Sequence, residues 1–243
     1  ATNPVPDDTN GVANVFVRDL KSGALARVSV DSTGAQGLGD SGSYYGPAIS
    51  ADGRHVAFFS LAPNLVPDDT NGNWDVFVRD LATATTTRVS VDSNGSEGRQ
   101  GILTPLSPPA LSADGRYVAF ESAANNLVPL DTNRSADVFV HDRKTGITTR
   151  VSVSSSGAQA DGASRTPSLS ADGRYVSFES SARNLGTSSF GIFVHDRLNG
   201  TTTLASLSSS GEPGNLGSGY ASLSPHGRYL VFQSASDRLI SGQ

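Results

Sequence analysis

A six-residue phrase, Leu/Ile-Ser-Ala/Pro-Asp/His-Gly-Arg, occurs four times in this chain of 243 residues. The copies occupy 49–54, 111–116, 169–174 and 223–228. Each copy leads directly into a short apolar stretch, such as Tyr117 to Phe120 in the second. Self-similarity at a nearly constant interval is the sequence signature of a repeat architecture. The chain is therefore best divided into repeated units of one local structure.

Two further phrases return in the same order within each repeat. The first is centred on Val/Ile-Phe-Val and lies at 14–19, 75–80, 137–142 and 191–196. The second is Arg-Val-Ser-Val in three of its four copies and lies at 26–30, 87–91, 149–153 and 204–207. Short segments rich in Val, Phe and Thr and bounded by Gly, Asp and Asn indicate strands. Because their centres are apolar on both faces, they indicate sheets buried between other sheets.

We therefore predict an all-β fold, a four-bladed β-propeller whose blades are four-stranded antiparallel sheets. The Asp-Gly step of each repeat predicts a tight turn between the first two strands, with the glycine supplying a positive φ. The chain, 1–243, is predicted to be a single propeller domain. It starts with third and fourth strands at about 14–30 and ends with first and second strands at about 220–234. This phase predicts that the N-terminal strands complete the last blade, which closes the ring and removes free sheet edges.

The second repeat carries a resemblance to a known family. Leu-Ser-Ala-Asp-Gly-Arg-Tyr-Val-Ala-Phe at 111–120, followed by Asp-Val-Phe-Val-His-Asp-Arg-Lys-Thr-Gly at 137–146, resembles the WD40-like (PD40) repeat of TolB-like β-propellers. The resemblance covers nearly the whole chain and implies the propeller fold. It implies less about function, because TolB-like propellers include protein-binding modules and similar blades accompany peptidases and glycan-active proteins. The loops after the second and the fourth strand of each repeat are longer here than in the family.

Those two long loops are expected on one face, because successive strands of a blade alternate in direction. In three repeats the loop after the second strand carries oxygen-bearing side chains at every second position. Calcium prefers six to eight oxygen ligands. The pattern predicts calcium sites with the candidate ligands Asp69, Asn71, Asn73, Asp75, Asp131, Asn133, Ser135, Asp137, Asp8, Asn10 and Asn14. The alternative is that Asp and Asn shape these loops as turn formers alone, and the third repeat lacks the pattern.

The loops after the fourth strands, at 31–46, 92–108, 154–166 and 208–219, are expected to break the repeat and to be shaped around a ligand. Within them, Tyr44 and Tyr45 are candidates for an aromatic platform that contacts a sugar or a partner side chain. The alternative is that both rings pack over the end of a first strand. Arg99 and Arg165 are candidates for binding an anionic ligand, with exposed surface charge as the alternative.

Catalytic arrangements are sparse in the sequence. Glu121 and Glu179 occupy the same position in two second strands, where a pair of carboxylates across a narrow ring would suit a glycosidase. The alternative is that each carboxylate faces solvent or meets the backbone of a neighbouring blade. His141 and His195 replace Arg18 and Arg79 of the other repeats, so we expect these histidines to be structural.

Composition restricts the partners. The net charge is −5 and the basic residues are scattered, which argues against a nucleic-acid partner. The chain has no cysteine, and no run of apolar residues is long enough for a membrane span. We expect a secreted or periplasmic binding module, not an enzyme, that engages a protein or carbohydrate through the face of long loops. The alternatives are a glycan-active enzyme that uses acidic residues and a bound cation, and a structural domain of a larger secreted protein.

Overall fold

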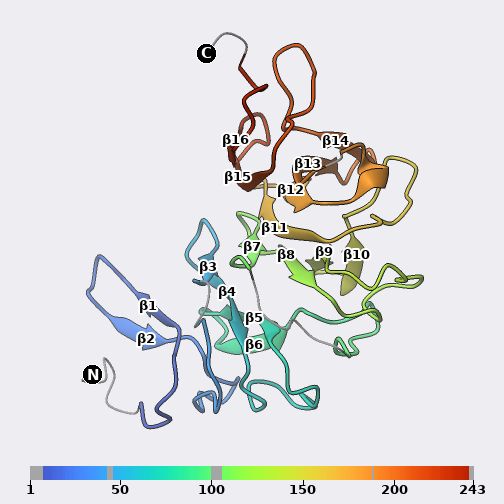
Figure 1. The fold of residues 1–243 in the computed structure, drawn as a ribbon. Coiled ribbons are helices and arrows are strands. Elements are labelled where there is room, and N and C mark those ends of the chain that lie inside the picture. Colours follow the sequence, from blue (N-terminus) through green and yellow to red (C-terminus); the bar gives the residue numbers. More distant parts are fainter. Residues whose placement is uncertain (1–7, 43–45, 100–105, 188, 241–243) are drawn as a thin grey trace.

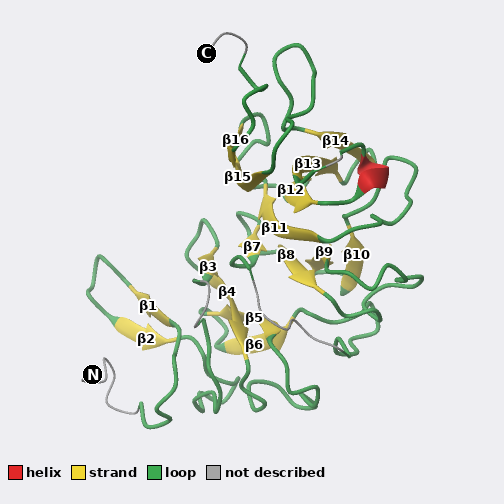
Figure 2. Cartoon of the chain, in the orientation of Figure 1, coloured by secondary structure: helices red, strands yellow, loops and turns green. Residues whose placement is uncertain are grey.

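The computed structural model describes residues 8–42, 46–99, 106–187 and 189–240. Three four-stranded antiparallel sheets follow one another along the chain (Figures 1 and 2). The first contains β3 (Ala48–Ile49), β4 (His55–Ser60), β5 (Asp75–Asp80) and β6 (Thr85–Arg88). The second contains β7 (Ala110–Leu111), β8 (Tyr117–Ser122), β9 (Asp137–Asp142) and β10 (Ile147–Arg150). The third contains β11 (Ser164–Leu169), β12 (Tyr175–Ser180), β13 (Gly191–Asp196) and β14 (Thr201–Leu204), with a short 3-10 helix η1 (Arg183–Leu185) after β12.

The two central strands pair in the same register in every sheet. A phenylalanine of the second strand faces a phenylalanine of the third, in the pairs Phe58–Phe77, Phe120–Phe139 and Phe178–Phe193. Their ring centroids lie 6.0, 5.9 and 5.8 Å apart, and all six rings are fully buried. The predicted four-stranded antiparallel blades are confirmed in these three sheets.

Each end of the chain contributes half a sheet. β1 (Phe16–Arg18) pairs with β2 (Leu25–Arg27), and β15 (Ser218–Leu223) pairs with β16 (Leu230–Ser234). In the described part of the chain these half-sheets are separate two-stranded sheets, and they lie at opposite ends of an arc (Figure 1). The predicted closure of the ring by β1 and β2 is therefore not observed, and a count of four blades is not confirmed. The sequence phase identified the halves correctly but carries no information about the angle between neighbouring sheets.

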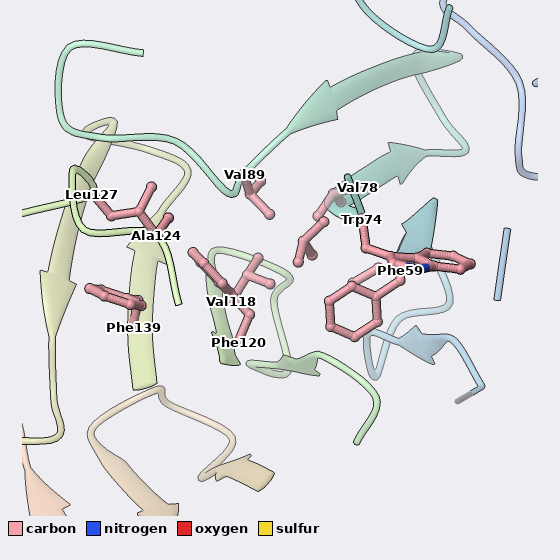
Figure 3. Packing of buried hydrophobic residues seen from close by; sticks show 11 residues of the cluster. Phe59, Trp74, Val78, Val89, Val118, Phe120, Ala124, Leu127 and Phe139 are labelled. Carbon is pink, nitrogen blue, oxygen red and sulfur yellow. The ribbon is translucent and has the colours of Figure 1, made fainter. Parts of the chain in front are cut away.

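Neighbouring sheets pack face to face through apolar side chains. Between the first two sheets, Val78 and Val89 of one lie against Val118 and Phe120 of the other (Figure 3). The remaining buried members of this cluster are Ala57, Phe59, Trp74, Val76, Ala124, Leu127 and Phe139. Strands that are apolar on both faces were predicted to lie between other sheets, and this packing shows why: each sheet has a neighbour on either side.

A ladder of backbone hydrogen bonds joins the turns between first and second strands. Ala51 N donates to Ala113 O at 3.0 Å, Ala113 N donates to Ala171 O at 2.8 Å, and Ala171 N donates to Pro225 O at 2.7 Å. The ladder runs in one direction and ends at Pro225, because proline has no N–H to donate. Each step ties one repeat to the next at the same position.

The same turns form a second contact between neighbouring sheets. The ring of Tyr117 lies against Gly173, and the ring of Tyr175 lies against Gly227. A Cβ atom placed on either glycine would come within 2.3 Å of the ring. Both glycines also have φ near +70°, so this turn position requires glycine for its backbone conformation and for the ring above it. The predicted Asp-Gly turn is confirmed.

The loops after the fourth strands repeat, contrary to the expectation. Each folds back after the strand in a short turn closed by a single antiparallel bridge, in the pairs Val30–Gln36, Val91–Glu97, Val153–Gln159 and Leu207–Pro213. A glycine of positive φ lies in every turn, at 34, 95, 157 and 211. That evenly spaced glycine was the sequence signal for the turn.

No helix in the described residues is long and apolar enough to cross a membrane.

Candidate functional site

The loop between β4 and β5 brings three carboxylates together. The Asp69, Asp75 and Glu97 carboxylates lie within 4.8 Å of one another. Glu97 comes from the turn after β6, which the sequence analysis did not include among the ligands. Arg88 of β6 lies among them, with its Nη1 atom 2.8 Å from Glu97 Oε2, 3.4 Å from Asp69 Oδ1 and 3.8 Å from Asp75 Oδ2. The site therefore combines three acids with one guanidinium.

The rest of the predicted ligand set shapes the loop. Asn71 Nδ2 donates to Asp75 Oδ2 at 2.8 Å, and the Asn71 Oδ1 atom accepts from Asn73 N at 2.7 Å. Asn73 Nδ2 donates to the Asn71 carbonyl. These are the turn-forming bonds of the alternative interpretation. They orient Asp75, whose Oδ1 atom also accepts from Ser90 Oγ at 2.5 Å.

Burial of these acids disfavours their charged forms. Burial raises the pKa of Asp69 to about 6, with a further contribution from the negative charge of Asp75 and an opposing one from Arg88. Burial also raises the pKa of Asp75, against the hydrogen bonds from Ser90 and Asn71. With all groups ionised the three carboxylates and Arg88 leave an excess of two negative charges, so the site favours an additional positive charge.

The loop between β8 and β9 builds a related site with less charge. Arg150 Nη1 lies 3.6 Å from Asp131 Oδ1 and 3.7 Å from Asp137 Oδ2. Gln159 takes the place of Glu97, and its Nε2 atom donates to both carboxylates, at 2.8 and 3.0 Å. Asn133 bonds Asp137, and Asn133 Oδ1 accepts from Ser135 N. An amide and a guanidinium thus satisfy the two acids.

The first loop carries the least charge of the three. Arg27 Nη2 lies 3.6 Å from Asp8 Oδ1. Asn14 replaces the second acid, and its Nδ2 atom donates to Asp8 Oδ1 at 3.1 Å and to Asn10 Oδ1 at 3.1 Å. One carboxylate and one guanidinium leave no net charge, so this loop is the least suited to a cation.

The arginine and the acids are lost together in the third repeat. At the positions of Asp75, Arg88 and Glu97 this repeat has Gly191, Leu204 and Pro213. The side chain of Leu204 packs close to Gly191. The arginine therefore belongs to the same unit as the loop acids, although it lies on a different strand. Its constant spacing from the loop was the sequence signal that identified it.

Glu121 and Glu179 both bind backbone N–H groups. Glu121 Oε1 accepts from Leu106 N at 2.6 Å and Oε2 accepts from Thr166 N at 3.1 Å. Glu179 Oε1 accepts from Tyr220 N at 2.5 Å. Each carboxylate thus meets the backbone of the next sheet, which was the structural alternative. Burial raises the pKa of Glu121, against these two backbone bonds.

An apolar pocket of about 350 Å³ lies beside these bonds. Its walls are the first strands of three successive sheets and the residues before them: 106–110, 166–168 and 220–222. Ser107 Oγ and Thr166 Oγ1 are buried and have no hydrogen-bond partner among the described residues. The first strands lie along the concave side of the arc (Figure 1). Sequence reasoning missed this pocket, because its residues come from three repeats and form no motif.

The backbone around the pocket is irregular. The register of β11 with β12 shifts between Arg165 and Ser168, and β15 shifts in the same place against β16. In these bulges Thr166 has φ +52° and Tyr220 has φ +56°, a conformation that side chains rarely adopt. Bulges often redirect side chains next to binding sites. Here they direct the N–H groups of both residues to the glutamates.

The other predicted ligand-binding residues are not gathered at one place. Tyr44 and Tyr45 lie outside the described residues. Arg99 is exposed, and its backbone N–H donates to Asn126 Oδ1 at 2.8 Å. Arg165 lies in β11 near the pocket, where its charge helps to stabilise ionised Glu121.

The histidines have structural partners, as expected. Arg79 Nη1 donates to Thr86 Oγ1, and His141 and His195 place Nδ1 against the equivalent Thr148 and Thr202. Each threonine hydroxyl donates to a carbonyl of the preceding repeat. The side chain at this strand position therefore supports a link between neighbouring sheets.

Comparison with known proteins identifies the fold of the chain. No family model and no curated protein matches the chain. Among solved structures it is similar to TolB from Acinetobacter baumannii, with a TM-score of 0.52 and 18% identity over 90% of this chain and 42% of that chain. It is also similar to a TolB-like protein from Agrobacterium tumefaciens, with a TM-score of 0.53 and 16% identity over 92% of this chain and 64% of that chain. The chain spans less than two thirds of either protein. Its repeated four-stranded sheets and these similarities together show a TolB-like β-propeller fold.

Proposed function

We propose that the chain is an extracytoplasmic binding module that holds an apolar group of a protein partner in the pocket between β7, β11 and β15. The observation that carries the proposal is the pocket itself, which has apolar walls and two hydroxyls, of Ser107 and Thr166, that have no hydrogen-bond partner among the described residues. Binding pockets commonly combine an apolar lining with a few polar groups that orient the ligand. The pocket is lined by the middle of β11 and of β15 and by the residues that precede β7.

The irregular backbone supports the same location. Thr166 and Tyr220 hold positive φ values, and strain of this kind clusters at ligand-binding sites. The side chain of Tyr220 is 74% exposed at the pocket, so it is available to a ligand. Glu121 and Glu179 spend their carboxylate oxygens on backbone N–H groups beside the pocket. This favours a binding module over the glycan-active enzyme.

Titration of the isotopically labelled protein with short peptides containing Leu or Phe tests the pocket. We expect amide shift changes at 106–110, 166–168 and 220–222. Truncation of Tyr220 in Tyr220→Ala should weaken binding by up to about tenfold, because an aromatic contact contributes about 0.5–1.5 kcal/mol. Leu198→Ala, at an equally exposed site in a distant turn, should bind as the wild type does. Shifts that appear only with oligosaccharides would point to a glycan instead, and no shift at these residues would refute the pocket.

We also propose that the Asp69 site binds calcium and orders its loop. Three carboxylates within 4.8 Å supply the hard oxygen ligands that calcium prefers. The excess of two negative charges matches a divalent cation, although Arg88 already neutralises part of the site. The Asp131 site has an excess of one negative charge, because Gln159 replaces Glu97 there. The Asp8 site has no excess, because Asn14 replaces the second acid and Gln36 stands at the position of Glu97. The three loops should therefore differ in affinity.

Thermal melting with and without calcium tests this proposal. A ligand at a hundred times its dissociation constant stabilises by about 2.7 kcal/mol, which corresponds to a rise of about 5–10 °C for a chain of this size. We expect that rise for the wild type in millimolar calcium relative to EDTA. Asp69→Asn should abolish it, and Asp131→Asn should leave it intact. Equal melting temperatures in calcium and in EDTA would eliminate the calcium site.

A further inference from the structure

The loop between β8 and β9 contains a polar pocket in addition to its paired carboxylates. The pocket has a volume of about 420 Å³, and small-molecule sites commonly measure about 300–1,000 Å³. It is lined by Ala123, Asn125, Asp131, Thr132, Arg134 and Ser135. All of these side chains except that of Ala123 carry hydrogen-bonding groups, so the pocket suits a polar ligand.

The loop between β4 and β5 is a direct reference for this pocket, because the two loops have the same length. Residues 61–74 and 123–136 connect strand pairs of the same register, with Ser60 opposite Asp75 and Ser122 opposite Asp137. Each residue of one loop therefore has one equivalent in the other. Three exchanges between the loops bear on binding: Pro63 to Asn125, Asp68 to Leu130 and Gly72 to Arg134.

Two of these exchanges change the charge of the loop. With all groups ionised, the Asp69 site has an excess of two negative charges, and Asp68 at its exposed rim adds a third. The Asp131 site has an excess of one, and Leu130, which is 84% exposed, adds none. Arg134 then cancels the remaining excess. The Asp69 loop therefore repels an anion, whereas the Asp131 loop offers it a guanidinium.

Arg134 occupies a backbone conformation that favours glycine. Its φ is +56°, and the equivalent Gly11 and Gly72 have φ values of +70° and +64°. A residue with a side chain is disfavoured there. The exposed guanidinium makes no hydrogen bond or ion pair with another described residue, so no such contact within the described chain offsets the strain. Strain of this kind is found at ligand-binding sites, and the guanidinium is free to bind a ligand.

The side chains of the pocket define the chemistry of that ligand. A guanidinium binds a carboxylate or a phosphate through two parallel hydrogen bonds. The nearby Asp131 carboxylate disfavours a doubly charged phosphate more than a singly charged carboxylate. Asn125, Thr132 and Ser135 both donate and accept hydrogen bonds, as the hydroxyl groups of a sugar do. A small ligand that carries one carboxylate and several hydroxyls is a sugar acid.

We propose that this pocket binds a sugar acid, with the carboxylate on Arg134 and the hydroxyls on Asn125, Thr132 and Ser135. Asp131 accepts a hydrogen bond from a further hydroxyl of the same sugar. The site shares no residue with the apolar pocket between β7, β11 and β15. It also lies in a different loop from the Asp69 carboxylates, so each of the three proposals can fail without the others.

Titration of the isotopically labelled protein with glucuronate and galacturonate tests the pocket, with glucose and galactose as the neutral counterparts. Amide shift changes are expected at 123–125 and 131–135. Each neutral sugar should bind about tenfold or more weakly than its acid, because hydrogen bonds to charged groups are the stronger class. Equal affinity for acid and neutral sugar, tighter binding of inorganic phosphate, or no shift at these residues would overturn the proposal. Disaccharides of the preferred acid separate the two sources: tighter binding than that of the monosaccharide identifies a glycan, and equal or weaker binding identifies the free sugar acid.

Substitutions taken from the reference loop test the role of Arg134 without a risk to folding. Arg134→Gly should weaken binding of the acid by about tenfold or more, and it should melt no lower than the wild type, because two other loops have glycine there. Leu130→Asp, which restores the acid of the reference loop, should also weaken binding of the acid but not of the neutral sugar.

Arg183→Ala is the matched control, because it removes an exposed arginine from the equivalent loop of the third sheet. It should bind the acid as the wild type does. Equal weakening in this control would show an effect of net charge alone and would overturn the site. Unchanged affinity in Arg134→Gly, or a melting temperature well below that of the wild type, would refute the role assigned to Arg134.

Discussion

Replacement of Gly173 by alanine is expected to lower the free energy of unfolding by about 2–5 kcal/mol. A φ of +70° costs an alanine about 1–2 kcal/mol. The new methyl group would also lie 2.3 Å from Tyr117 Cδ2, and overpacking of this kind costs about 1–3 kcal/mol. The Arg116 and Arg197 guanidinium groups, 4.6 and 4.4 Å from the ring centroid of Tyr117, restrict the movement of this ring away from the methyl group. Urea denaturation followed by fluorescence measures the loss.

Gly146→Ala is the matched control for this variant. Gly146 has φ +74° in the turn between β9 and β10, and the described residues leave the space around its Cβ open. It should therefore lose only the conformational part, about 1–2 kcal/mol. Equal losses in the two variants would show that the ring-on-glycine contact contributes nothing to the interface between sheets.

Replacement of Arg88 by methionine should lower the free energy of unfolding by a comparable amount. The guanidinium is the only cation among Asp69, Asp75 and Glu97 in the described structure, and removal of one partner from a buried ionic group costs about 3–5 kcal/mol. Arg150→Met removes the equivalent arginine, but Gln159 would still bind both carboxylates there. We expect a smaller loss for Arg150→Met, measured by urea denaturation in EDTA. Equal losses would refute the role assigned to Gln159.

The loss in Arg88→Met should shrink as the pH falls. The pKa of Asp69 is about 6 in the folded protein and about 3.9 in an unfolded chain. Between these two values the folded state binds a proton at Asp69 that the unfolded chain does not bind. The stability that this proton confers is therefore fully present below pH 4 and is lost as the pH rises through 6. Without Arg88 this pKa should rise further, so the gap between variant and wild type should be smaller at pH 5 than at pH 7. A constant gap across this range would contradict the charge-based explanation.

The strands and their order were predictable because the same strand-forming phrases recur in the same order in every repeat. The Val-Phe-Val segments are apolar on both faces, and the Asp-Gly step has one low-energy turn, so local chemistry decides both. The bridges after the fourth strands were equally regular. They were missed because the variable residues around Gly34 and Gly95 obscured the constant spacing of those glycines.

The sites were less predictable because their partners come from different strands. The Asp-x-Asn pattern located Asp69 and Asp75, but Glu97 and Arg88 enter only when β6 folds beside β5. Glu121 has the chemistry of a catalytic acid in isolation, and only the bulge at Thr166 shows that it binds backbone. Ring closure is not confirmed, and the angle between sheets on which it depends is set by packing that no single repeat position encodes.

The ladder of turns that ends at Pro225 has a consequence for how such a chain can lengthen. Each turn offers an N–H to the next repeat and a carbonyl to the previous one. A duplicated repeat inserted anywhere before Pro225 would find both partners. A repeat appended after Pro225 would find no donor at that turn. Growth by duplication, in evolution or in design, is therefore accommodated in the interior of the array and resisted at its C-terminal end.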